Sequence, residues 1–362
     1  MRCLKCGNQI KELFTIRDGR YICRKCLVFK NKEDKEEKHK GEGTYYLDYD
    51  LTKEQLKASN FILKEIINKR SCILNAITGA GKTEIIYPLI KYCIDNELKI
   101  CIAIPRKDVV IELKQRISKD FKNATVIGVY GGCNSKIYGD VVVATTHQLY
   151  RYENYFDVVI VDEVDAFPFY KNQLLNHFLN RCLKGNIVYM SATIPIDLMK
   201  KGYNIYYLNR RYHNEKLDVP KVKYLFGNSS IKKYIRRYKT GILLVYFPTI
   251  RSQISFSRKL KIKHYVINSH KKNREELLNL LHQQDNAIVL TTLVLERGIT
   301  FKNSNVIVVN ADHELFSFEN LVQISGRVGR HYLFTHGDII FLAKNKSKTI
   351  KKAIDFIKRR NE

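Results

Sequence analysis

Short apolar runs alternate with helical patterns along residues 71–191. Five of the runs have strand length and are rich in β-branched side chains: Ser71–Asn75, Lys99–Ile104, Val141–Thr145, Val158–Asp162 and Asn186–Ser191. A run without polar alternation predicts a strand buried on both faces, and helix-length segments between such strands predict a parallel sheet covered by helices. We therefore expect an α/β domain in this part of the chain.

The same pattern recurs after residue 240. Helical segments such as Arg274–Gln284 separate five further runs: Gly241–Phe247, His264–Ile267, Ala287–Thr291, Val306–Ala311 and Gly337–Leu342. Polar residues 209–211 and later Pro220 interrupt the periodicity between the two sets. The pattern therefore predicts two tandem α/β domains, and a basic helix from about Ser347 to Arg360 closes the chain.

Residues 30–40 carry nine charged side chains in eleven and no apolar residue. Such a segment cannot bury enough surface to offset the cost of ordering it, so we interpret it as a linker or a solvated helix. The predicted organisation is a small module over residues 1–29, a charged linker over 30–44, a first domain over 45–210 and a second over 211–362.

The composition changes this picture mainly through charge. The chain has 362 residues, 63 of them basic and 36 acidic, with a formal net charge of +27. That excess favours a polyanionic partner, most commonly nucleic acid, although a generally basic proteome is the alternative. No stretch approaches the roughly 20 apolar residues of a membrane span, and the N-terminus lacks a signal-peptide core. We therefore expect a cytoplasmic protein.

Four of the nine cysteines form two CxxC pairs separated by sixteen residues: Cys3, Cys6, Cys23 and Cys26. This spacing is typical of paired zinc knuckles that place four thiolates around one Zn²⁺ ion. Because four sulfur ligands leave no position for water, the predicted zinc is structural and holds the small module together. A redox-active CxxC is the alternative.

A glycine-rich segment follows the first predicted strand and precedes the helical run Glu84–Ile94. It predicts a phosphate-binding loop whose ATP contacts come from Thr78, Gly79, Ala80, Gly81, Lys82 and Thr83. Lys82 would pair with the β/γ-phosphates and Thr83 with Mg²⁺. Ala76 stands where the usual pattern has its first glycine, so a chance glycine-rich turn is the alternative.

Two carboxylates, Asp162 and Glu163, end the apolar strand Val158–Asp162. Asp162 can hold Mg²⁺ and Glu163 can orient or deprotonate the attacking water, as in nucleotide hydrolysis. A solvated acidic turn is the alternative, but the phosphate loop about eighty residues upstream makes a hydrolytic site the better interpretation. These two motifs alone indicate a nucleotide hydrolase.

Further motifs follow in the order found in superfamily two helicases, which the chain resembles from residue 52 onward. The resemblance implies that ATP binding involves Gln55 and Gly298, that coupling involves Ser191 and Thr193, and that catalysis involves Gln323, Arg327 and Arg330. It implies that DNA is bound by Pro105, Arg106, Thr146, His147, Pro248, Thr249 and Thr292. Without the resemblance, a salt-bridge role for Arg106 would be preferred. The implied fold is two RecA-like parallel-sheet domains behind the zinc module.

The last of these motifs has a clear physical rationale. Arg327 and Arg330 would be fixed bidentate donors on the second domain that reach the γ-phosphate only on closure, and such arginines can contribute about 10³–10⁵ in rate. Phosphate contacts from the predicted DNA-binding residues carry little sequence information. Binding is therefore expected to be salt-sensitive and independent of sequence.

The four-cysteine module in front of a short two-domain motor resembles the ComFA family, late-competence ATPases of Gram-positive bacteria. That resemblance implies an ATP- and Mg²⁺-dependent protein at the inner face of the cytoplasmic membrane, which draws incoming single-stranded DNA through an uptake channel. Implied partners are that channel and a phosphoribosyltransferase-like protein from the same operon; contact with an anionic membrane and homo-oligomerisation are left open.

Three departures from the helicase pattern limit what is transferred. The chain is short, the magnesium motif reads DEVD, and the fifth motif ends in Thr300 where many relatives have Asp. Translocation is thus a safer prediction than unwinding. Two alternatives stay open: a replication-restart or repair helicase resembling PriA, whose cysteines lie within the motor, and a nucleic-acid-binding module with a silent motor.

Overall fold

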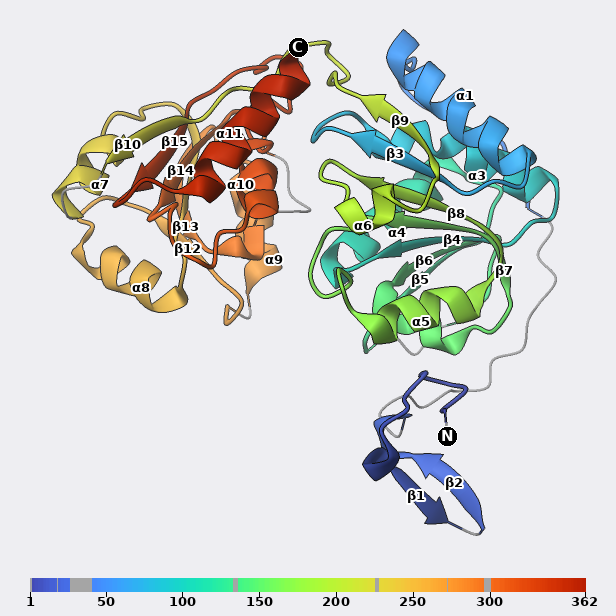
Figure 1. Ribbon diagram of the computed structural model, residues 1–362. Helices are drawn as coiled ribbons and strands as arrows, with labels where there is room; N and C mark the ends of the chain where they lie inside the picture. The colour runs from blue at the N-terminus through green and yellow to red at the C-terminus, as the bar shows by residue number, and fades with distance from the viewer. Residues whose placement is uncertain are drawn as a thin grey trace. The chain divides into compact units, whose positions relative to one another are not determined.

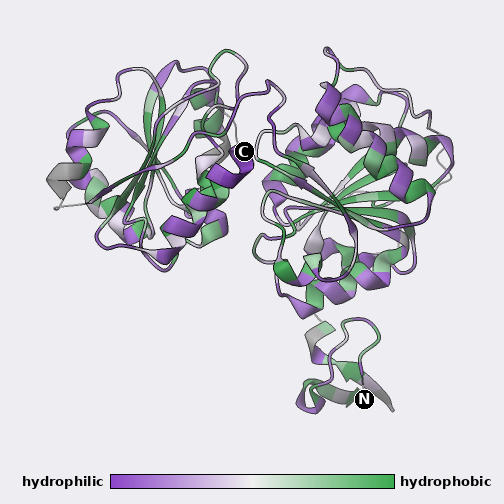
Figure 2. Cartoon of the chain, turned by 45° about the horizontal axis from the view of Figure 1, so that its top comes forward, coloured by the Kyte–Doolittle hydropathy of each residue, from purple (hydrophilic) through white to green (hydrophobic). Residues whose placement is uncertain are grey.

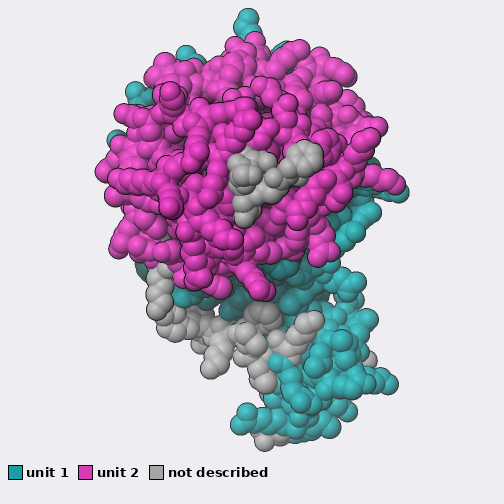
Figure 3. Space-filling view, turned by 90° about the vertical axis from the view of Figure 1, so that its left-hand side faces the viewer, with its two compact units in different colours: residues 1–76, 81–208 teal, residues 77–80, 209–362 magenta. Residues whose placement is uncertain are grey.

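Two parallel sheets, each in its own compact unit, carry the fold of the computed structural model (Figure 1). The structure describes residues 2–17, 19–26, 41–132, 136–224, 228–271, 273–295 and 301–362. Unit 1 comprises Met1–Ala76 and Gly81–Leu208, and unit 2 comprises Ile77–Ala80 and Asn209–Glu362 (Figure 3). The division at Leu208 falls two residues before the predicted boundary. The predicted linker residues 30–40 lie outside the described residues.

Unit 1 contains a seven-stranded sheet in the order β5-β6-β4-β7-β8-β3-β9, with every neighbouring pair parallel. The strands are β3 (Cys72–Ala76), β4 (Ile100–Ile104), β5 (Val126–Val129), β6 (Val141–Thr145), β7 (Phe156–Asp162), β8 (Leu183–Ser191) and β9 (Asn204–Leu208). The five predicted strands are confirmed. The sequence missed the two edge strands, β5 and β9, because both are partly exposed and lack a continuous apolar run.

Helices cover both faces of this sheet. They are α1 (Lys53–Ile67), α2 (Lys82–Ile85), α3 (Tyr87–Asp95), α4 (Lys107–Asp120), the 3-10 helix η3 (Thr146–Arg151), α5 (Gln173–Cys182) and α6 (Ile196–Met199). Phe178 of α5 and Leu149 of η3 are buried in one core cluster with strand residues such as Val159. α1 begins with a capping box in which Thr52 and Gln55 bond reciprocally, which fixes the start of the helix.

Unit 2 contains a six-stranded parallel sheet in the order β10-β15-β14-β11-β13-β12. Its strands are β10 (Lys221–Tyr224), β11 (Gly241–Tyr246), β12 (Tyr265–Ile267), β13 (Asn286–Thr291), β14 (Ser304–Val309) and β15 (Ile339–Ala343). The five predicted strands are again confirmed, and the missed strand, β10, is a largely exposed edge. The predicted α/β class with two RecA-like domains is therefore confirmed.

The helices of unit 2 form two layers. They are α7 (Asn228–Ile235), α8 (Ile250–Lys259), α9 (Arg274–His282), η4 (Leu293–Leu295), α10 (Phe318–Ser325) and α11 (Lys348–Asn361). α7 and α8 pack on one face of the sheet through Ile235 and Phe256, whereas α10 and α11 pack on the other through Ile324 and Ala353. The central strands are hydrophobic while the helices present mixed surfaces (Figure 2).

The N-terminal module is a small hairpin unit. It consists of η1 (Lys11–Leu13), β1 (Phe14–Arg17), β2 (Arg20–Cys23) and η2 (Arg24–Cys26). β1 and β2 pair antiparallel, with Phe14 opposite Cys23. Among the described residues of the whole chain, no helix combines the length and apolar character needed to cross a bilayer.

Candidate nucleotide site and metal centre

In the sheet of unit 1, strand order places three strands that end in predicted motifs side by side. β8 lies between β3 and β7, with Asn75 opposite Ser191 and Asp162 opposite Met190. Because all three strands run parallel, the loops that follow them leave the sheet at the same edge. The phosphate loop after β3, the carboxylates after β7 and the predicted coupling residues after β8 are therefore neighbours.

Lys82 and Asp162 form an ion pair with 3.1 Å between Nζ and Oδ1, and each side chain is about one-fifth exposed. Gly79 and Gly81 have φ angles of 81° and 74°, in the left-handed region that glycine adopts without steric cost. Thr78 and Ala80 are buried, whereas Thr83 is half-buried. The loop thus has the backbone conformation and the cation that a phosphate ligand requires.

Gln55, which is predicted to bind ATP, lies against this loop. Its side chain is buried, and its Oε1 accepts a hydrogen bond of 2.9 Å from the backbone N–H of Thr52. A Cβ atom at Gly81 would lie 2.3 Å from the Gln55 Nε2, so a larger residue at Gly81 would displace this amide. The capping box of α1 therefore sets the position of Gln55 next to the phosphate loop.

Glu84, two residues after Lys82, is a site residue that the motif pattern did not predict. Its buried carboxylate accepts a hydrogen bond of 2.9 Å from the Tyr49 hydroxyl and forms an ion pair with Arg116. A buried carboxylate needs partners of this kind to stay charged. Glu84 thereby fastens the start of the helix that carries Lys82, and its position directly after Thr83 was the available signal.

Glu163 occupies a strained backbone position. Its φ angle is 55°, which a non-glycine residue adopts at a cost of about 1–3 kcal/mol and which clusters at functional sites. Its backbone N–H donates a hydrogen bond of 2.9 Å to the Asp162 Oδ1. The two predicted catalytic carboxylates are thus held in one tight turn at the end of β7.

Asp165, the last residue of the DEVD segment, binds the predicted coupling residues. It accepts hydrogen bonds from the Ser191 hydroxyl and, at 2.6 Å, from the Thr193 hydroxyl; the Thr193 N–H in turn donates 3.1 Å to the Ser191 Oγ. All three side chains are buried. The carboxylate turn and the segment after β8 are therefore one connected unit, and the sequence analysis did not assign Asp165.

The residues predicted to contact DNA in unit 1 differ in accessibility. Arg106 is half-buried, and its Nη2 lies 3.8 Å from the Asp108 carboxylate. Arg106 therefore forms a salt bridge, the role that the sequence favours when the family resemblance is set aside. Pro105 and Thr146 are buried, whereas the neighbouring His147 is exposed. Of these residues, Arg106 and His147 present their side chains to solvent, and the DNA-binding roles stay predictions.

The predicted DNA-binding residues of unit 2 follow adjacent strands. Tyr246 at the end of β11 lies opposite Thr291 at the end of β13, so Thr249 and Thr292 lie at the same carboxyl edge. Thr249 caps α8, where its Oγ1 accepts 3.1 Å from the Ser252 N–H, and Pro248 is buried. The Thr249 hydroxyl therefore already has a structural role. Gly298 lies outside the described residues.

The predicted catalytic residues Gln323, Arg327 and Arg330 lie on α10 and the turn after it. Gln323 and Arg327 are buried, and the Arg330 Nε donates 2.8 Å to the Gly326 carbonyl. Gly329, with a φ angle of 68°, gives the turn its shape. Arg330 is thus held by a carbonyl of its own turn, and Arg327 is buried.

Three consecutive side chains that the sequence analysis missed hold this turn within unit 2. The Arg211 Nη1 donates 2.5 Å to the Gly329 carbonyl, the His213 Nε2 lies 2.9 Å from the same oxygen, and the Tyr212 hydroxyl donates 2.8 Å to the Arg330 carbonyl. Arg211 is buried, and burial lowers its pKa to about 10. No sequence signal links segments more than a hundred residues apart.

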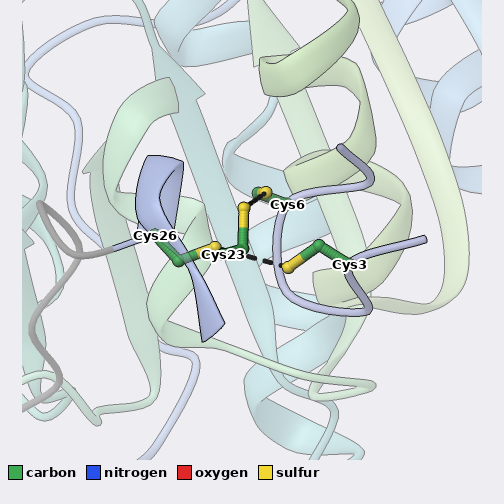
Figure 4. A group of neighbouring side chains, drawn as sticks. All are labelled: Cys3, Cys6, Cys23 and Cys26. Carbon is green, nitrogen blue, oxygen red and sulfur yellow. Dashed lines mark hydrogen bonds between the residues drawn. The ribbon is translucent and has the colours of Figure 1, made fainter. Parts of the chain in front are cut away.

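The four N-terminal cysteines converge from two segments of the chain (Figure 4). All four sulfur atoms lie within 4.8 Å of one another; the Cys3 and Cys26 sulfurs are 3.5 Å apart and those of Cys6 and Cys23 are 3.6 Å apart. A tetrahedron with Zn–S bonds of about 2.3 Å has sulfur separations of about 3.8 Å. The set fits a structural zinc site of four thiolates.

Surroundings of this cluster agree with a metal centre. The buried Asn8 Nδ2 lies 3.6 Å from the Cys23 sulfur, a contact that would stabilise a thiolate. Burial and the neighbouring thiols raise the pKa of Cys26 above its usual range, and a bound divalent cation would reverse that effect. On the far side, the His177 Nε2 of α5 lies 3.2 Å from the Leu4 carbonyl, a contact between the module and the rest of unit 1.

Comparison with known proteins gives two family matches along the chain. Residues 48–196 match the family described as type III restriction enzyme, res subunit, and residues 228–332 match the helicase conserved C-terminal domain. The chain is 31% identical to competence protein ComFA of Bacillus subtilis, across 100% of this chain and 86% of that protein. It is 32% identical to competence protein ComFA of Streptococcus pneumoniae, across 99% and 90%.

Solved structures of helicases share the fold. A DEAD-box helicase, Mss116, bound to single-stranded RNA and UDP-BeF is similar with a TM-score of 0.63 at 18% identity, covering 84% of this chain and 77% of that one. RecG bound to a three-way DNA junction is similar with a TM-score of 0.57 at 16% identity, covering 88% and 48%. At such identities the likeness concerns the fold alone.

Proposed function

Since this chain belongs to the ComFA family of competence proteins, we propose that it is an ATP-driven translocase that moves along single-stranded DNA and powers the uptake of transforming DNA. At a coarser level, the family and domain matches identify a competence-associated, helicase-like ATPase of superfamily two. The observation that carries the proposal is the joined site of unit 1, where the Lys82–Asp162 pair lies beside the Asp165–Ser191–Thr193 cluster.

In the proposed reaction, water attacks the γ-phosphorus of ATP while the bond to the bridging oxygen breaks, releasing ADP and phosphate. Lys82 would hold the phosphates, and Glu163 would orient the water and accept its proton. Magnesium held by Asp162 and Thr83 would neutralise charge on the phosphate oxygens. Arg327 and Arg330 would stabilise the transition state, with Gln323 beside them, while Gln55 and Gly298 contact the nucleotide.

Coupling to DNA follows from the hydrogen bonds of Asp165. A DNA strand bound near the end of β8 can shift Thr193 or Ser191, and Asp165, which bonds both hydroxyls, would pass the shift along the backbone to Glu163, two residues earlier in the same turn. We propose that this route makes hydrolysis depend on the bound strand. Arg106, His147 and Thr292 are the proposed strand contacts, and the structural zinc would stabilise the N-terminal module.

Location and partners are proposed from family membership. The protein would act at the inner face of the cytoplasmic membrane, with the uptake channel and a phosphoribosyltransferase-like protein as partners. The net charge of +27 suits both DNA and an anionic membrane surface. Sedimentation of the purified protein would measure whether it self-associates.

The decisive experiment compares ATPase rates of purified protein with single-stranded DNA, duplex DNA and RNA at low salt. We expect single-stranded DNA to raise the rate most and the stimulation to fall with added salt, because phosphate contacts dominate the affinity. A rate unchanged by single-stranded DNA would overturn the proposal. Unwinding of a forked duplex would instead favour a repair helicase.

A further inference from the structure

One segment of unit 2 is strongly and uniformly basic. Between Asp218 and Glu275 the sequence contains fifteen lysines and arginines and no acidic residue. This stretch, about one-seventh of the chain, supplies fifteen of its 27 net positive charges. Positive charges this close in the sequence repel one another and destabilise the fold unless an anionic partner neutralises them.

These side chains gather around α7 and α8 and the loops that flank them. Ten of the fifteen lie on α7, on α8 or in the loops that flank them, and nine of these are exposed in the described part: Lys233, Arg236, Arg237, Lys239, Arg251, Arg258, Lys259, Lys261 and Lys263. α7 and α8 lie on this face of the sheet of unit 2 (Figure 1). Lys221 on β10 pairs with Asp338, but among the described residues no carboxylate forms an ion pair with any of these nine, so their positive charge is uncompensated.

A pocket of about 340 Å³ opens beside this basic face, at the amino ends of the strands. Tyr238 and Lys239 precede β11, Lys263 and Tyr265 lie at the start of β12, and Asn286 begins β13. The predicted DNA contacts Thr249 and Thr292 lie at the opposite, carboxyl ends of the same strands. The six residues of β11 separate the two edges by about 17 Å.

The pocket has the chemistry of a nucleotide site. The Tyr238 hydroxyl is buried and has no hydrogen-bond partner among the described residues, and burial raises the pKa of Tyr238, which keeps this group a neutral donor. The Gln284 Nε2 donates 2.8 Å to the Tyr265 hydroxyl, which leaves that hydroxyl able to donate. Two phenol rings can stack on a base while Lys239 and Lys263 neutralise its phosphates.

The surface favours nucleic acid over a membrane. Between residues 219 and 274, the exposed large hydrophobic side chains in the described part are Val219, Tyr224 and Ile254, each between 36% and 48% exposed. A surface that binds lipid through insertion needs bulky apolar groups beside its charges, and these few are only partly exposed. Aromatic rings recessed among lysines instead fit unstacked bases.

We propose that the α7–α8 face and its pocket bind a second stretch of the single-stranded DNA, with a base between Tyr238 and Tyr265 and phosphates on Lys239 and Lys263. The inference rests on the proposed function in taking DNA as the ligand. A strand that leaves the carboxyl edge of unit 2 would then follow the basic face to the amino edge. The occupied strand is longer than the motor motifs alone would hold.

The test uses the full chain with Lys239→Ala and Lys263→Ala combined. The matched control combines Lys119→Ala and Lys122→Ala, two exposed lysines of unit 1 that leave the same net charge. Binding is measured by fluorescence anisotropy with labelled oligo(dT) of rising length and at several salt concentrations. Basal ATPase activity checks that both proteins are folded.

We expect the affinity of each protein for oligo(dT) to rise with oligonucleotide length. For the pocket variant this rise should stop at a shorter length than for wild type and control. With long oligo(dT), the slope of log K against log salt should be smaller in magnitude by about 1.4 for the pocket variant, since each lost single-strand phosphate contact removes about 0.7. Tyr238→Phe, which keeps the ring, should bind long oligonucleotides more tightly than Tyr238→Ala.

Two outcomes would overturn the second site. The first is equal length dependence and equal salt slopes in pocket variant and control, while wild type still binds DNA and is stimulated by it; the proposed function then stands alone. The second is unchanged DNA binding with lost binding to phosphatidylglycerol vesicles, which would assign the face to a membrane. If wild type neither binds nor responds to single-stranded DNA, the proposed function fails together with this inference.

Discussion

The carboxylate of Asp165 accepts a hydrogen bond of 2.6 Å from the hydroxyl of Thr193, twenty-eight residues further along the chain. Together with the bond from Ser191, this contact joins the turn that carries Asp162 and Glu163 to the segment after β8. Hydrogen bonds to a charged group contribute roughly 1.5–3 kcal/mol each, so these two bonds fasten the two loops to each other.

Replacing Asp165 by Asn tests this connection. An amide accepts at one atom only, so one of the two hydroxyls loses its acceptor, and we expect unfolding free energy to fall by about 1–3 kcal/mol. More specifically, stimulation of the ATPase by single-stranded DNA should drop while basal hydrolysis largely remains. Asp197→Asn, an exposed change on nearby α6, is the control; full stimulation in Asp165→Asn would rule out the coupling role.

Glu163→Gln tests the hydrolytic assignment. A group that positions and deprotonates water typically contributes about 10²–10⁴ in rate, and we expect turnover to fall by that factor with DNA binding intact. Lys82→Ala should abolish turnover as well, through weaker nucleotide binding. Steady-state ATPase assays and anisotropy measure the two properties, with Glu97→Gln as an exposed control. Normal turnover in either variant would mean that the site lies elsewhere.

Cys23→Ser tests the metal centre. Loss of one of four thiolates should release zinc and lower the melting temperature, since metal binding and folding of so small a module are coupled. Cys93→Ala is the control, because Cys93 is a buried core residue far from the cluster in sequence; it should lose some stability and keep the metal. Elemental analysis and thermal unfolding give the readouts. A Cys23→Ser protein with full metal content would refute the assignment.

His213 predicts a pH dependence. The Glu215 N–H donates 3.3 Å to its Nδ1, and its Nε2 faces the Gly329 carbonyl, so the two contacts fit the neutral ring with its proton on Nε2. Burial lowers the pKa of His213 below 6.5. Its stabilising contribution is therefore complete above about pH 6.5, the unfolded value, and is lost as pH falls toward the lower folded pKa.

Thermal unfolding between pH 5 and 8 checks this expectation. His213→Gln, which keeps a donor and removes the titration, should lose less stability than wild type on acidification. The matched control is His270→Gln, because His270 is exposed and lies outside the turn that carries Gly329. Identical acid sensitivity in wild type and His213→Gln would exclude His213 as the titrating group.

Arg211→Ala should impair hydrolysis through the turn that carries Arg330. The Gly329 carbonyl would lose a charged donor, and the turn held by the 211–213 segment would loosen. We expect a lower kcat with little change in KM for ATP, and partial recovery with Arg211→Lys. A change confined to the melting temperature, with kcat preserved, would limit Arg211 to a structural role.

The strands that sequence could predict are those whose burial leaves a continuous apolar run, such as β4 and β14. Edge strands like β9, where exposed and half-buried positions mix, have no such signature. Motif residues such as Lys82 and Asp162 were predictable because the chemistry constrains residue type and local spacing. Partners such as Arg211 and Gly329 were not, since their contact depends on the folded chain and on a backbone carbonyl that any residue offers.

The Lys82–Asp162 ion pair has a consequence for ligand selection. Each group is the other's counterion, so a ligand that takes only one of them leaves an uncompensated charge in a partly dehydrated site. ATP alone would satisfy the ammonium and isolate the carboxylate, and a free cation would do the reverse. A chelated metal–nucleotide complex brings a replacement counterion for both groups at once, which would let this enzyme discriminate against a nucleotide or a metal ion that arrives alone.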